Sequence, residues 1–137
     1  MSTLVIGVGN TLRGDDGVAA RVLELLEAKA PGAFVLQAAF SLLPELAEDL
    51  VAHERVIFVD ADVLAREVSL RPVTQERDGL HRFAPWGVVS MARSLGFLGE
   101  AWVCRLPVEA MGAGEGLSAA AVAVAEQAVL QLVRLQP

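Results

Sequence analysis

The chain has 137 residues, a length typical of one domain; 54% of them are hydrophobic and 20% are charged. This composition excludes an intrinsically disordered chain, and no apolar run reaches the roughly 18 residues that a membrane-spanning helix needs. The net charge of −6 disfavours a general nucleic-acid-binding protein, which would carry a basic surface. We therefore expect a globular protein with neither nucleic-acid nor membrane partners.

Strands and helices are expected to alternate along the chain. Residues 3–8 form a continuous β-branched apolar run, which is typical of a strand buried on both faces. Pro72 favours an edge position for its strand, and Ser118 is suited to cap the last helix. The expected strands span residues 3–8, 34–36, 55–60, 68–73 and 101–106, and the four expected helices begin at Val18, Pro44, Pro85 and Ala119.

This alternation implies βαβ units with right-handed crossovers. The predicted fold class is therefore α/β: one domain over residues 1–137, built as a three-layer sandwich. Helices should cover both faces of a mainly parallel five-stranded sheet.

The cysteine content and the first residues suggest where the protein resides. A single cysteine, Cys104, can form neither an internal disulfide nor a cysteine-based zinc cluster. Residues 1–3 lead straight into an apolar segment, without the basic start and small-residue cleavage site of a signal peptide. The sequence therefore predicts a cytoplasmic protein.

Polar residues gather where the predicted parallel strands end. Asp15 and Asp16 follow the first strand, Asp60 and Asp62 end the third, and His81 lies in the loop before the helix at Pro85. Ligands bind beyond the carboxyl ends of the strands in sheets of this kind. Two carboxylates and an imidazole form a mixed oxygen–nitrogen set that suits a divalent transition metal such as nickel, zinc, cobalt or manganese. An open coordination position would remain for substrate or water.

Each of these residues also has a structural interpretation. Asp15 or Asp16 could cap the first helix, since carboxylates favour helix N-termini. Asp60 could be a buried, hydrogen-bonded aspartate and His81 an ordinary loop histidine, so the hypothesis depends on their convergence. His53 should lie at the opposite edge of the sheet, as a structural or solvated residue.

Other polar and aromatic residues are interpreted as structural. Cys104 lies mid-strand and is expected to pack as a small hydrophobe, because a strand-buried thiol is usually inert. Solvated faces are expected at Glu54, Arg55, Arg66 and Glu67, and packing roles at Trp86 and Trp102.

Three other kinds of site fit the sequence poorly. Neither a Gly-x-Ser-x-Gly elbow nor a His-Glu-x-x-His motif is present. The Gly7-x-Gly9 turn is similar to that of a dinucleotide site, but the third glycine position is Leu12. Two acidic residues then start the helix, where they would repel a pyrophosphate. A small-ligand-binding α/β domain is therefore a minor alternative.

Four motifs follow one another along the chain. They are GVGNTLRGDDG at residues 7–17, VIFVDA at 56–61, HRFAP at 81–85 and EGLS at 115–118. The first motif resembles the N-terminal signature of the nickel–iron hydrogenase maturation proteases, the second resembles that family's apolar strand ending in Asp-Ala, and the third resembles its histidine shortly before a helix. The first motif is fairly specific; the others are weak singly, but their order extends the resemblance through nearly the whole chain.

The resemblance implies an endopeptidase of the aspartyl type that removes the C-terminal extension of a hydrogenase large-subunit precursor once nickel is inserted. The family's three metal-contacting positions correspond to Asp16, Asp60 and His81. We therefore expect Asp16 to point into the cleft and Asp15 to hydrogen-bond the first turn of the helix. These residues would contact nickel carried by the substrate, or another divalent metal in its place. A precursor without metal would then offer no binding energy at this site.

Parts of the sequence depart from the family pattern. Many members have an Asp-Gly-Gly-Thr-like loop where this chain has residues 37–41, QAAFS, and Leu80 and Ala19 replace a frequent serine and glycine. The altered loop supports an alternative function, a non-catalytic maturation chaperone that binds the metal or the large subunit without cutting it.

Overall fold

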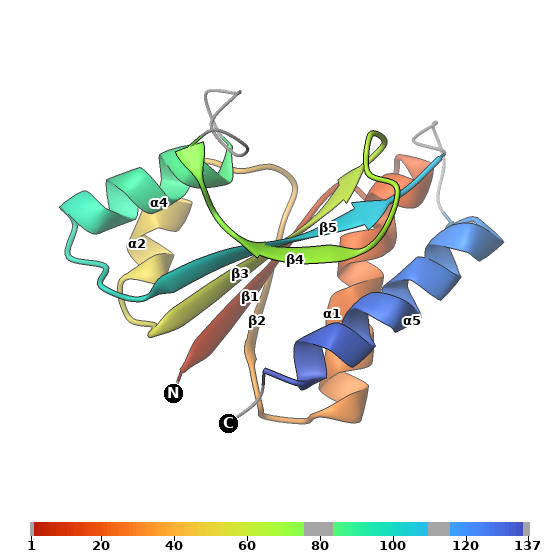
Figure 1. The fold of residues 1–137 in the computed structure, drawn as a ribbon, viewed down its shortest axis with the longest axis horizontal. Helices are drawn as coiled ribbons and strands as arrows, with labels where there is room; N and C mark the ends of the chain where they lie inside the picture. The colour runs from red at the N-terminus through yellow and green to blue at the C-terminus, as the bar shows by residue number, and fades with distance from the viewer. Residues whose placement is uncertain (1, 76–83, 110–115, 136–137) are drawn as a thin grey trace.

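The computed structural model describes residues 2–75, 84–109 and 116–135. Its centre is a five-stranded sheet in the order β2-β1-β3-β5-β4 (Figure 1). The parallel strands are β1 (Thr3–Val8), β2 (Val35–Ala39), β3 (Arg55–Asp62) and β5 (Glu100–Pro107), and β4 (Ser69–Pro72) is antiparallel. The predicted mainly parallel sheet is confirmed, as is the edge position of the strand that contains Pro72.

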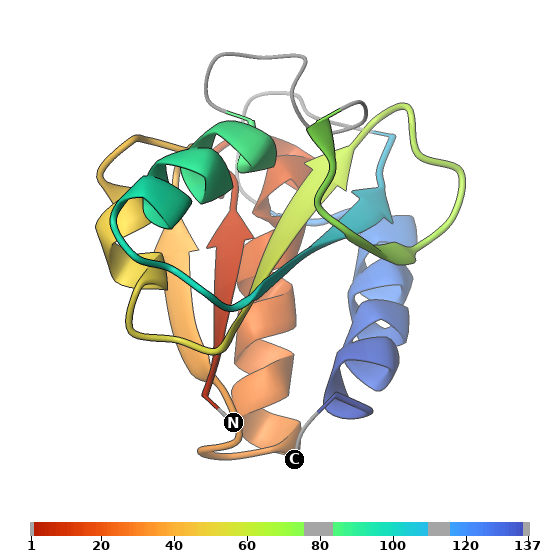
Figure 2. The ribbon, with the colours of Figure 1, turned by 60° about the vertical axis from the view of Figure 1, so that its left-hand side comes forward.

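Helices cover both faces of the sheet, so the predicted three-layer α/β architecture is also confirmed. One face carries α1 (Val18–Lys29) and α5 (Ala119–Val133), and the other carries α2 (Leu46–Leu50) and α4 (Pro85–Ser94) (Figure 2). Alternate residues of one strand serve the two cores: Ile57 packs on the α1 and α5 side, and Phe58 on the α2 and α4 side. A strand buried on both faces must be apolar at successive positions, as the sequence shows.

Two strands, β2 and β3, extend at least two residues past their predicted ends, whereas β5 exceeds its predicted range by one residue at each end. β2 runs to Ala39 because it pairs with β1 along its whole length, from Leu4 opposite Val35 to Val8 opposite Ala39. β3 runs to Asp62, which lies opposite Pro107 of β5. Backbone pairing with a neighbour thus extends each strand beyond its own apolar run.

The amino-terminal edge of the sheet holds His53 and Arg55. His53 Nδ1 lies 2.6 Å from the Ser2 hydroxyl, in the structural role expected at this edge. The expectation that Arg55 is solvated is wrong. Its Nε donates to Thr3 Oγ1 at 3.1 Å, and its Nη2 donates to the Leu135 carbonyl oxygen. The side chain is drawn inward because Arg55 pairs with Thr3 in the sheet and lies near the end of α5.

The remaining structural expectations agree with the structure. Glu54, Arg66 and Glu67 are exposed. Trp86 and Trp102 are half-buried and line a pocket of about 390 Å³ between α4 and the β4–β5 edge. Among the described residues, none of the helices combines the length and apolar character that crossing a bilayer requires.

Cys104 is fully buried in the core beneath α1 and α5, as predicted. Burial raises the pKa of its thiol to about 12, so the reactive thiolate is scarce at neutral pH. We expect Cys104→Ala to lower the free energy of unfolding by about 1 kcal/mol. The wild-type thiol should react with iodoacetamide at pH 8 far more slowly in the folded protein than in urea. Rapid labelling of the folded protein would contradict this role.

Candidate active site

The loop after β1 holds Asp16 in a defined position. The Asn10 backbone N–H donates to Asp16 Oδ2 at 2.8 Å, and the Asn10 side-chain oxygen accepts from the Leu12 N–H at 2.9 Å. One aspartate oxygen is thus held by the backbone. The other, Oδ1, has no hydrogen-bond donor within the part of the chain that the structure describes.

Gly9 is needed for this arrangement. A Cβ atom at Gly9 would lie 2.0 Å from the Asp16 carbonyl oxygen, closer than any real contact, and its φ of 154° disfavours other residues. The Gly-Asn…Asp signature is therefore one structural unit that folds back on Asp16. In this unit the Asp16 carboxylate accepts the hydrogen bond of the Asn10 N–H. A bound pyrophosphate would need the same turn, so the arrangement disfavours a nucleotide-binding site.

Asp60 lies near the carboxyl end of β3, the central strand of the sheet, between Val8 of β1 and Arg105 of β5. Burial is the main cause that raises the pKa of its carboxyl to about 6. The charges of Asp16 and Asp62 raise this pKa further, while Arg105 and a hydrogen bond from the Ala61 backbone lower it. The charge of Asp16 acts on Asp60, and the turn that holds Asp16 contacts β3, so the two predicted carboxylates lie near each other.

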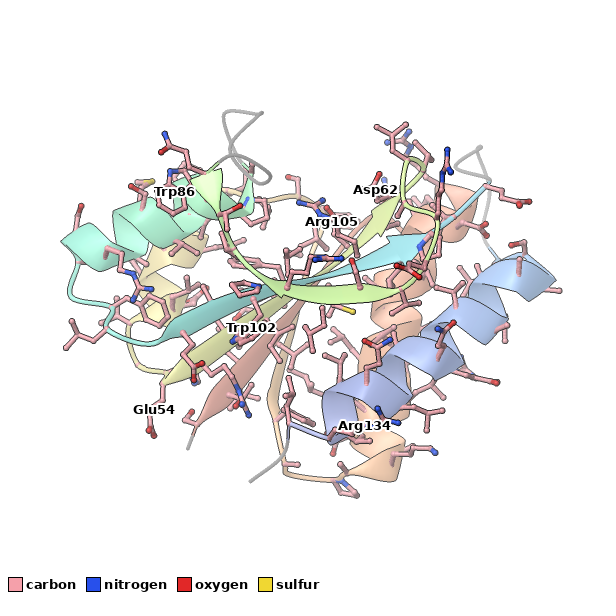
Figure 3. All side chains as sticks on the ribbon, in the orientation of Figure 1. Glu54, Asp62, Trp86, Trp102, Arg105 and Arg134 are labelled. Carbon is pink, nitrogen blue, oxygen red and sulfur yellow. The ribbon has the colours of Figure 1, made fainter. Side chains whose placement is uncertain are left out.

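Asp62 and Arg105 lie together at the same end of the strands, far from Glu54 at the opposite end (Figure 3). Asp62 Oδ2 is 3.8 Å from Arg105 Nη1, and Asp62 Oδ1 accepts from the Leu64 N–H at 2.8 Å. Asp62 is therefore engaged in shaping its own loop. Of the two aspartates that end this strand, Asp60 is the better candidate for binding a ligand.

Arg105 is the site residue that sequence reasoning missed. Its only sequence signal is a charged residue within an otherwise apolar strand, residues 101–106. Its proximity to Asp60 follows from the pairing of β3 with β5, which no local pattern encodes. Its positive charge favours the ionised form of Asp60 and lies beside the carboxylate of Asp62.

The expectation that Asp15 hydrogen-bonds the first turn of the first helix is wrong, because its partner is Ser118. Asp15 is buried and caps neither the 3-10 turn that contains it, η1 (Gly14–Gly17), nor α1. Its Oδ1 instead accepts from the Ser118 N–H at 2.8 Å, and its Oδ2 accepts from the Ser118 hydroxyl at 2.9 Å. Ser118 Oγ in turn accepts from the Ala121 N–H at 3.1 Å, as the cap of α5. Asp15 thus joins the loop that bears Asp16 to the start of α5.

We expect Asp15→Asn to destabilise the protein by about 1–3 kcal/mol, because an amide removes the charge from two partly buried hydrogen bonds. Ser118→Ala should cost a similar amount, since it removes one of these bonds and the helix cap. Urea unfolding of the single variants and the double variant tests this. A double-variant loss equal to the sum of the two single losses would show that the residues do not act as a pair.

His81, the third member of the predicted triad, lies outside the described residues. Within the part of the chain that the structure describes, no group of three His, Cys, Asp or Glu side chains could hold a metal ion. The structure therefore brings Asp16 and Asp60 together, and the triad with His81 stays a prediction.

The chain is similar to several proteins of known structure. Nothing matches the chain among protein-family models or among curated proteins. Among solved structures, it is similar to the hydrogenase 2 maturation peptidase from a Thaumarchaeota archaeon, with 26% identity, a TM-score of 0.71, and coverage of 98% of this chain and 97% of that one. It is also similar to the hydrogenase maturating endopeptidase HybD from E. coli, with 24% identity, a TM-score of 0.78, and coverage of 98% and 91%.

A third similar structure covers both chains completely. It is the [NiFe] hydrogenase maturation protease HybD from Thermococcus kodakarensis, with 21% identity and a TM-score of 0.71. Fold and site together define an α/β protein with a carboxylate pair at the carboxyl edge of its sheet. This fold is that of the hydrogenase maturation proteases, and the resemblance predicted from the sequence motifs is confirmed.

Proposed function

We propose that this protein is an endopeptidase that removes the C-terminal extension of a nickel-loaded [NiFe] hydrogenase large-subunit precursor. The observation that supports this most is the proximity of Asp16 and Asp60 at the carboxyl edge of the sheet. The family resemblance assigns metal contacts to these two residues. Structures of the same fold are named as hydrogenase maturation peptidases.

In this proposal Asp16, Asp60 and His81 contact the nickel ion that belongs to the substrate. Nickel accepts carboxylate oxygens and imidazole nitrogen, so this donor set suits the ion. Asp16 would offer Oδ1, since Oδ2 is held by Asn10. Asp60, with a pKa of about 6, is mostly ionised at pH 7.5. We expect the three side chains to bind at roughly 2.0–2.2 Å from the metal.

The metal would mark the precursors that have received nickel and are ready for cleavage. Two carboxylates close together repel each other, and a cation between them relieves that repulsion. A nickel-free precursor brings no such cation and should bind weakly. The cytoplasmic location and the use of another divalent metal in place of nickel stay predictions.

The test is incubation of the purified protein with nickel-loaded and nickel-free precursor. Mass spectrometry should detect the shortened large subunit and the released C-terminal peptide only with the nickel-loaded form. Equal cleavage of both forms would contradict the marking role of the metal. No cleavage of either form would contradict the proposed activity.

A non-catalytic maturation chaperone is the second candidate. The departure of residues 37–41 from the usual loop favours it, because this loop exposes Phe40 beside the site in place of polar residues. In the same assay a chaperone would give a stable, uncut complex with the nickel-loaded precursor. Size-exclusion chromatography of the incubation mixture separates the two outcomes.

A further inference from the structure

Large apolar side chains are exposed on the three loops that follow β1, β2 and β3. These strands are parallel neighbours in the sheet, so their carboxyl ends and following loops share one edge. It is the same edge that holds Asp16 and Asp60. We call these side chains the apolar rim; it consists of Leu12, Phe40, Leu43, Val63 and Leu64.

The position of the apolar rim distinguishes it from other exposed apolar residues. Phe40 is 74% exposed and Leu64 is 86% exposed. Single exposed leucines are ordinary in proteins, and Leu98 is 94% exposed at the opposite edge of the sheet. The rim residues, by contrast, come from three separate loops around one pair of carboxylates. Apolar residues gathered around a candidate site mark an interaction surface.

The contacts that hold the site loops also hold the apolar rim. Asp62 Oδ1 accepts from the Leu64 N–H at 2.8 Å, and Asn10 Oδ1 accepts from the Leu12 N–H at 2.9 Å. The Gly9 N–H donates to the Ala39 carbonyl oxygen at 2.9 Å, directly before Phe40. Each loop is therefore held by a hydrogen bond at or directly before a rim residue. Preorganisation of this kind lowers the entropic cost of binding.

The charge at the centre of the rim narrows the choice of partner. The charged side chains that act on Asp60 are those of Asp16, Asp62 and Arg105, so the described centre is acidic. An apolar rim around an acidic centre is complementary to a surface that presents a cation within apolar side chains. The nickel ion of the proposed substrate supplies the cation that is complementary to this acidic centre.

We propose that the apolar rim docks the large-subunit precursor through apolar side chains that surround its nickel site. This inference rests on the proposed function for the identity of the partner. The apolar rim would supply affinity for the precursor protein, whereas Asp16 and Asp60 would contact its nickel ion. Loss of a rim side chain should therefore weaken substrate binding without altering the chemical step.

Phe40→Ser and Leu64→Ser in the full chain test this proposal, with Leu98→Ser as the matched control. All three side chains are largely exposed, so we expect circular dichroism and thermal unfolding to be unchanged. The affinity for nickel-loaded precursor, measured by biolayer interferometry, should fall about 10-fold for each rim variant. KM should rise similarly with kcat within about twofold, and Leu98→Ser should match the wild type.

The outcomes separate this inference from the proposed function. Rim variants that bind and cleave like Leu98→Ser would overturn the docking role. Wild-type protein that binds the precursor through the rim without cutting it would overturn the peptidase and support docking. Wild-type protein that neither binds nor cuts would overturn both. Self-association that is lost in Phe40→Ser, with unchanged precursor affinity, would assign the rim to a second copy of this chain and overturn the proposal.

Discussion

Asp16→Asn is expected to lower the rate of precursor cleavage by more than about 100-fold, with the free energy of unfolding within about 0.5 kcal/mol of the wild-type value. Asparagine keeps a side-chain oxygen that can accept from the Asn10 N–H, so the loop should stay folded. It removes the negative charge that would bind the metal. Cleavage assays followed by mass spectrometry, together with urea unfolding, measure the two effects.

Asp15→Asn is the matched control for this variant. Asp15 is adjacent in sequence, yet its carboxylate faces Ser118 and the start of α5. Its loss should appear mainly in stability and reach cleavage only through the position of the loop. If Asp15→Asn abolished cleavage at unchanged stability while Asp16→Asn cleaved normally, the roles of the two aspartates would be exchanged.

Asp60→Asn is expected to stabilise the folded protein at pH 7.5 while abolishing cleavage. The pKa of Asp60 rises from 3.8 to about 6 on folding, mainly through burial, so the folded state holds this proton more tightly than the unfolded state. Stability therefore falls as pH rises from about 4 to 6, and the loss is complete above the folded pKa. A shift of about two units corresponds to roughly 3 kcal/mol at most, and we expect the amide to recover on the order of 1–3 kcal/mol.

Urea unfolding of the wild type and Asp60→Asn across pH 4–8 measures this effect. The stability difference should grow between pH 4 and 6 and then remain constant. Glu67→Gln, which neutralises an exposed carboxyl, should show no such growth. If Asp60→Asn were less stable than the wild type at every pH, the carboxylate would be a net stabilising group, and burial would not dominate its pKa.

The sequence by itself determined the succession of strands and helices, and its motifs, through their resemblance to a known family, singled out Asp16 and Asp60 as candidates. A continuous apolar run such as residues 3–8 predicts a strand that is buried on both faces of the sheet. Pro72 predicts that its strand lies at the edge of the sheet, because proline has no backbone N–H to donate to a neighbouring strand. Asp16 could be singled out because its signature is local: Gly9, Asn10 and Asp16 form one hydrogen-bonded turn. These features depend on neighbours only a few residues away.

The tertiary structure alone decided which distant residues meet. Asp15 and Ser118 are 103 positions apart, so no local pattern shows that the carboxylate binds the cap of the last helix. Arg105 lies next to Asp60, and Arg55 is drawn inward, only because of the strand pairing. Side-chain patterns encode which face of an element is buried, whereas register and strand order follow from packing the whole sheet between its two helical layers.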